Sequence, residues 1–114
     1  MTGRDGASFL ETQAERVEAI LAKYPPERKQ AAVMPLLFLA QQAEGHVTER
    51  AVAAIARLLD LEPTQVGSLV GFYTLFSFRR LGRYRMQICT DLPCALRGSE
   101  EFSRQVCGRL GVRP

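Results

Sequence analysis

The chain has 114 residues, enough for one domain or for a small domain with an appendage. Its composition, 46% hydrophobic and 24% charged, is ordinary for a globular protein, and its net charge of +3 does not by itself indicate a nucleic-acid partner. No apolar run reaches the roughly 18 residues of a membrane span. The N-terminus lacks the apolar segment of a secretory signal, so the sequence predicts a cytoplasmic protein.

The first residues have the pattern of two long helices. Ser8 and Glu11 match a capping box, which predicts a helix over about residues 9–23. A second helix is predicted over about residues 27–44. Pro35 lies inside it and predicts a kink, because proline lacks a backbone donor and its ring crowds the preceding turn.

Two further helices are predicted before residue 78. Gly45 should end the second helix, and Thr48 is a suitable N-cap for a third. Its apolar residues recur at helical spacing: Val52, Ile55, Ala56 and Leu59. Pro63 favours the first turn of a fourth helix, which would run to about Phe76. Together these elements predict a compact four-helix module over residues 1–78.

The pattern changes after this module. From Arg83 to Cys89 apolar and polar residues alternate, which is the period of a β-strand. Cys94 should begin a last helix, which Gly111 ends and whose apolar stripe is Phe102, Val106 and Leu110. A single strand cannot satisfy its backbone groups as a sheet, so it needs neighbours that this chain does not contain. The predicted fold class is therefore α+β with an incomplete sheet.

Cys89 and Cys94 form a C-x4-C pair where the predicted strand meets the last helix. Thiolates bind iron and are stabilised near the positive end of a helix, and C-x4-C also occurs in plant-type [2Fe–2S] patterns. By spacing alone, two half-buried free cysteines are the alternative. Cys107 lies about three helical turns from Cys94, too far for the same cluster, and is expected to be a small, half-buried hydrophobe.

The late arginines and the single histidine can each be explained without a function. The late arginines form either a solvated face or a docking surface for an acidic partner: Arg79, Arg80, Arg83, Arg85 and Arg97. His46, the only histidine, follows Gly45 and is expected to be a surface residue or a cation at a helix C-terminus. No phosphate-binding glycine motif is present, so the chain itself should bind neither NADH nor flavin.

Residues 51–73 have a rival interpretation as a DNA-binding helix-turn-helix. A recognition helix should present arginine, lysine, asparagine or glutamine to base edges. The second helix of this pair offers only Gln65 and no basic residue. Nucleic acid is therefore not the expected partner.

Five segments, in this order along about residues 21–110, resemble one known family: Tyr24-Pro-Pro-Glu27, Met34-Pro-Leu-Leu37, Val70-Gly-Phe-Tyr-Thr74, Gln87-Ile-Cys-Thr90 and Cys94-Ala-Leu-Arg-Gly98. That family is the thioredoxin-like [2Fe–2S] ferredoxin subunit of bacterial NADH-quinone oxidoreductase, or complex I. The resemblance implies that residues 79–114 begin a thioredoxin-like ferredoxin domain that is truncated here. It also implies that Cys89 and Cys94 are two of four cluster ligands, the second pair being absent from this chain.

The same resemblance implies an electron-transfer subunit of an NADH dehydrogenase. One electron would pass between a [2Fe–2S] cluster and a flavin, with FMN and NADH held by a flavoprotein partner in the complex. The isolated chain would have no catalytic residue. Its expected place is the cytoplasm, peripheral to the inner membrane through the complex and without inserting into it. The alternative function is a protein-interaction module that binds no cluster.

Overall fold

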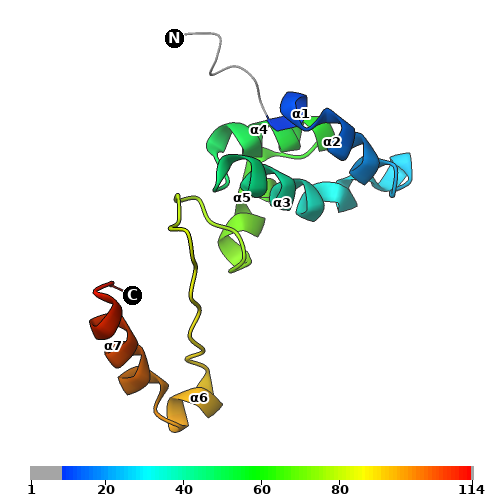
Figure 1. Cartoon of the computed structure of the whole chain (residues 1–114). Helices are drawn as coiled ribbons and strands as arrows, with labels where there is room; N and C mark the ends of the chain where they lie inside the picture. Colours follow the sequence, from blue (N-terminus) through cyan, green and yellow to red (C-terminus); the bar gives the residue numbers. More distant parts are fainter. Residues whose placement is uncertain (1–8, 114) are drawn as a thin grey trace. The chain divides into compact units, whose positions relative to one another are not determined.

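The computed structural model describes residues 9–113, which divide into two units, one up to Gly82 and one from Arg83 (Figure 1). Ser8, the first residue of the predicted capping box, lies outside the described residues. None of the helices in this range is both long and apolar enough to cross a membrane. The helices of the first unit are α1 (Phe9–Thr12), α2 (Ala14–Leu21), the 3-10 helix η2 (Pro26–Ala32), α3 (Val33–Glu44), α4 (Glu49–Leu59) and α5 (Pro63–Phe72).

Each of the first two predicted helices is divided in the structure. Gln13, with φ −118° and ψ 27°, separates α1 from α2. The predicted kink at Pro35 is wrong, because Pro35 lies in the first turn of α3, where backbone nitrogens have no helical acceptor. The backbone instead departs from helical geometry at Arg28, with φ −127° and ψ 25°, inside η2. The predicted four-helix module is therefore observed as a larger set of shorter helices.

The helix ends in the middle of this unit follow local chemistry. Gly45 adopts a left-handed φ of 83° and ends α3, as predicted. The prediction for Thr48 is also confirmed, since its Oγ1 accepts a hydrogen bond of 3.0 Å from the Ala51 N–H at the start of α4. Helix α5 ends at Phe72, earlier than predicted, because Tyr73 has extended backbone angles of φ −91° and ψ 121°.

The segment after α5 returns to α3 through the side chain of Gln41. The Gln41 Nε2 donates to the Leu75 carbonyl at 2.9 Å, and the Ser77 N–H donates to Gln41 Oε1 at 2.8 Å. The Val47 N–H also donates to the Ser77 carbonyl at 2.8 Å. These bonds hold the segment in place, and Phe76 within it is buried.

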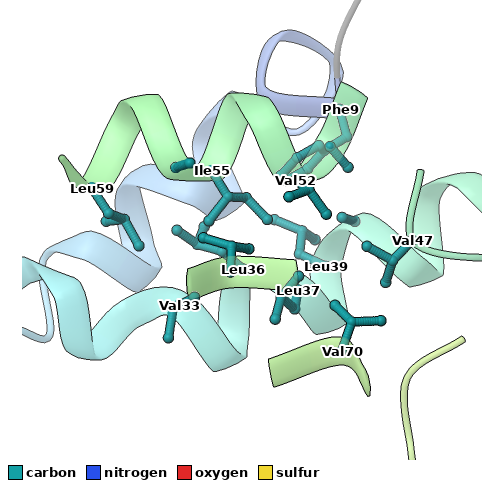
Figure 2. Close-up of a cluster of buried hydrophobic side chains, with 14 of the residues drawn as sticks. Phe9, Val33, Leu36, Leu37, Leu39, Val47, Val52, Ile55, Leu59 and Val70 are labelled. Atoms are coloured by element: carbon teal, nitrogen blue, oxygen red, sulfur yellow. The ribbon is translucent and has the colours of Figure 1, made fainter. Parts of the chain in front are cut away.

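The core of the first unit lies between α3, α4 and α5, which pack against one another in the order α3–α4–α5. Figure 2 shows side chains of α4 and α3, among them Ile55 and Leu36, pointing toward one another. The stripe predicted for the third helix is buried throughout: Val52, Ile55, Ala56 and Leu59. Burying a valine, isoleucine or leucine side chain fully contributes about 1.5–3 kcal/mol to stability.

The second unit contains α6 (Leu92–Leu96) and α7 (Ser99–Leu110). The strand predicted from Arg83 to Cys89 is not formed, and no residue between 9 and 113 is in a β-strand. A strand requires a hydrogen-bonded neighbour, which no described segment supplies. The α+β class is therefore corrected for the described residues, which contain helices and irregular segments only. The helix predicted from Cys94 is also divided, because Gly98 has a left-handed φ of 96°.

Candidate metal centre

Cys89 and Cys94 meet in one hollow of the second unit. Cys89 lies near the end of the irregular segment before α6, and Cys94 lies inside α6, two residues after its start. The loop between them is joined to the helix by a hydrogen bond of 2.8 Å from the Ala95 N–H to the Asp91 carbonyl. The hollow has a volume of about 570 Å³, and both cysteines line it, together with Gln87, Ile88, Pro93, Arg97, Gly98, Ser99 and Phe102.

The two thiols are close enough to influence one another. A hydrogen bond between the side chains of Cys94 and Cys89, the charge of Cys89 and partial burial, in that order, raise the pKa of the Cys94 thiol. A negative charge on one sulfur thus holds the proton on the other. A bound metal cation would reverse this preference, because thiolates ligate metals only after losing their protons.

The sulfurs and their surroundings fit an iron–sulfur cluster. Both face an open hollow rather than a packed interior, since Cys89 is exposed and Cys94 is half-buried. Cysteine thiolates are the usual ligands of [2Fe–2S] clusters, which take four of them in the all-cysteine form. Among residues 9–113 no group of three or more histidine, cysteine, aspartate or glutamate side chains is arranged to hold a metal. Cys89 and Cys94 are two thiols, half the number that an all-cysteine cluster takes.

Cys107 does not join this pair. It is half-buried, as expected, and lines a different hollow of about 350 Å³ in the same unit. The neighbours of Cys107 in that hollow include Met86, Val106 and Leu110, which are apolar. This environment suits the small hydrophobe that the sequence predicts, and it separates Cys107 from the site of Cys89 and Cys94.

Ser99 is a residue of the site to which the sequence assigned no role. It is the first residue of α7, it is buried, and its Oγ has no hydrogen-bond partner among residues 9–113. It lines the same hollow as Cys89 and Cys94. In sequence, a serine directly after a glycine at a helix start resembles an ordinary cap. Its burial beside the cysteines is apparent only in the structure.

The other polar residues that the sequence singled out are His46 and the late arginines. His46 is half-buried and lines a hollow of about 790 Å³ in the first unit. Within the part of the chain that the structure describes, its Nδ1 has no hydrogen-bond partner. The late arginines are all exposed: Arg79 and Arg80 in the first unit, and Arg83, Arg85 and Arg97 in the second. Only Arg97 among them lines the cysteine hollow.

Comparison with known proteins points to one family. The sequence profile described as thioredoxin-like [2Fe-2S] ferredoxin matches residues 17–114. The chain is 39% identical over 106 residues to NADH-quinone oxidoreductase subunit 2 of Thermus thermophilus, covering 93% of this chain and 59% of that protein. It is 39% identical over 107 residues to an NADH-quinone oxidoreductase subunit of Rickettsia conorii, covering 93% of this chain and 64% of that protein.

A mitochondrial protein gives a similar match. The chain is 38% identical over 106 residues to the mitochondrial NADH dehydrogenase [ubiquinone] flavoprotein 2 of Dictyostelium discoideum, covering 92% of this chain and 43% of that protein. The chain thus spans about half, and at most 64%, of the length of these relatives.

Proposed function

Because the chain belongs to the thioredoxin-like [2Fe–2S] ferredoxin family, we propose that it is part of an electron-transfer subunit of an NADH dehydrogenase complex. Cys89 and Cys94 are two of the four thiolate ligands of its cluster, and the other two come from polypeptide outside these 114 residues. The observation that carries the proposal is the meeting of the two thiols in one open hollow. The names of the relatives support the assignment to NADH dehydrogenase.

The chain's own residues prepare the site for the cluster. Cys89 and Cys94 each give up a proton on binding and hold iron through their sulfurs. Pro93 lies between them in the first turn of α6, where its fixed φ limits the conformations of the loop. A bound [2Fe–2S] cluster supplies one-electron chemistry, so no side chain of the site has to act as an acid or a base.

The partner in this proposal is a flavoprotein subunit that binds NADH and FMN. Reduced flavin carries two electrons, and a [2Fe–2S] cluster held by Cys89 and Cys94 would exchange one electron with that flavin. The subunit lies in the cytoplasm, peripheral to the inner membrane through the other subunits of the complex. Residues 1–78 form its helical module, residues 79–114 begin its ferredoxin domain, and the isolated chain has no catalytic activity.

Exposed side chains support docking by the helical module. Large apolar residues remain exposed on and after α5: Phe72, Tyr73, Leu75 and Phe78. The exposed Arg79 and Arg80 follow them directly. Aromatic residues and arginine are enriched at protein interfaces, so this segment suits a partner surface that combines apolar and acidic side chains.

The test uses the native protein, purified without oxygen from cells that make it. We expect bound iron and sulfide, and a paramagnetic signal after reduction with dithionite. Both Cys89→Ser and Cys94→Ser should lose the signal. The matched control Cys107→Ser should keep it, because Cys107 lines another hollow. Native protein without iron would contradict the proposal, and co-purification of a flavoprotein with that iron-free protein would favour the cluster-free interaction module.

A further inference from the structure

Ser99 places an unused hydrogen-bond donor in the hollow of the cysteine pair. The residue is 9% exposed, its Oγ is buried, and no group among the described residues accepts or donates a hydrogen bond at that atom. A buried hydroxyl without a partner is unfavourable and uncommon in folded proteins. The Ser99 hydroxyl therefore needs a hydrogen-bond acceptor that the described residues do not supply.

The helix that Ser99 begins does not use this hydroxyl. Helix α7 has Gly98 as its N-cap and no side-chain cap, and the Phe102 N–H donates to the Gly98 carbonyl at 3.0 Å. The neighbouring carboxylates of Glu100 and Glu101 are exposed and approach Arg104 at 3.8 and 3.4 Å. Capping and local ion pairing within the described residues thus do not involve the Ser99 hydroxyl.

The residues around Ser99 indicate what this acceptor is. Cys89, Cys94 and Ser99 line one hollow, so a cluster held by the two thiolates would bring sulfur atoms close to the space that Ser99 borders. Sulfurs of iron–sulfur clusters accept hydrogen bonds from protein donors, and these bonds tune the reduction potential. Reduction adds one negative charge, so a donor to sulfur stabilises the reduced state more than the oxidised state.

We propose that Ser99 is a positioning residue for the [2Fe–2S] cluster, and that its hydroxyl donates a hydrogen bond to a cluster sulfur and raises the reduction potential. This inference rests on the function proposed above. It adds a residue that is not a ligand and assigns it a specific effect on electron affinity. Ser99→Ala should keep the cluster but lower its midpoint potential.

The experiment is an anaerobic redox titration of the native cluster-bound protein with dithionite and mediator dyes, followed by the signal of the reduced cluster. We expect Ser99→Ala to weaken electron affinity by up to about tenfold, which for one electron corresponds to about 59 mV. Ser99→Thr, which retains a hydroxyl, should restore most of the shift. Ser103→Ala is the matched control on the same helix, because Ser103 lines the other hollow.

A vibrational readout separates hydrogen bonding from a change in packing. Exchange into deuterated water should shift the Fe–S stretching bands of the native protein, and Ser99→Ala should reduce this shift while Ser103→Ala should not. Ser99→Gly also lacks the hydroxyl and should reproduce the fall in potential.

Two results would overturn the inference while leaving the proposed function intact. The first is a cluster-bound Ser99→Ala protein with the midpoint potential of the Ser103→Ala control. The second is loss of the cluster from both Ser99→Ala and Ser99→Gly, which would make Ser99 a requirement for assembly rather than a tuning residue. Failure of the proposed function is distinct, because native protein with an intact Ser99 would then contain no iron.

Discussion

At the scale of single residues, the ionisation of Cys94 depends on Cys89. The hydrogen bond between the two side chains and the charge of Cys89 are the two largest causes that raise the pKa of Cys94, ahead of partial burial. A thiol whose pKa is raised stays protonated at a pH where an ordinary thiol has begun to ionise. In the metal-free chain, Cys94 should therefore react with alkylating agents only at a higher pH than an ordinary cysteine.

The rate at which iodoacetamide alkylates each cysteine can be measured as a function of pH by mass spectrometry. In Cys89→Ala the curve for Cys94 should move to lower pH, because both contributions of Cys89 are removed. Cys107 in the same sample is the control, and its curve should not move. An unchanged curve for Cys94 would show that the two thiols do not interact in solution.

At the scale of secondary-structure elements, two glycines of the second unit have different backbone conformations. Gly98 separates α6 from α7 with a φ of 96°, while Gly108 lies within α7 and has ordinary helical geometry. Among the described residues, no atom other than those of chain neighbours and of the helix itself lies within 4 Å of where a Cβ would be at either position. Only the backbone conformation therefore distinguishes alanine substitutions at the two sites.

Gly98→Ala should destabilise the junction of α6 and α7 by about 1–2 kcal/mol, because a Cβ is unfavourable in the left-handed region. Gly108→Ala should stabilise α7 by roughly 0.5–1 kcal/mol through its higher helix propensity. Amide hydrogen exchange along residues 92–110 measures both effects. Equal protection in the two variants would contradict the left-handed conformation of Gly98.

How far sequence predicts these elements depends on the range of the interactions that form them. Thr48 and Gly45 act within a few residues, so the start of α4 and the end of α3 could be predicted. The break at Arg28, whose N–H donates to the Pro25 carbonyl at 2.8 Å, was not predicted from the helical spacing of apolar residues. The strand from Arg83 to Cys89 has the right alternation of residues, but strand formation needs a partner that alternation does not provide.

The same distinction holds at the candidate metal centre. Cys89 and Cys94 could be singled out because the spacing of two thiols along the chain is visible in sequence. Ser99 could not, because its burial and its lack of a hydrogen-bond partner depend on the fold around it. Half-burial of His46 was missed for the same reason.

At the scale of the whole molecule, the two units differ in how they are stabilised. Every buried apolar side chain among the described residues lies between Phe9 and Phe76, within the first unit. The second unit instead exposes many large apolar side chains: Tyr84, Met86, Leu92, Leu96, Phe102, Leu110 and Val112. Burial of apolar surface is the main favourable contribution to folding, so the stability of this chain should reside in residues up to 82.

A fragment of residues 1–82 should therefore unfold cooperatively in urea with nearly the same midpoint as the full chain, measured by circular dichroism. Within it, Ile55→Ala should lower the free energy of unfolding by about 2–5 kcal/mol, because Ile55 is fully buried. Arg57→Ala on the exposed side of α4 is the control and should change it little. A markedly lower midpoint for the fragment would contradict this prediction, because it would show that residues 83–114 contribute to the stability of the first unit.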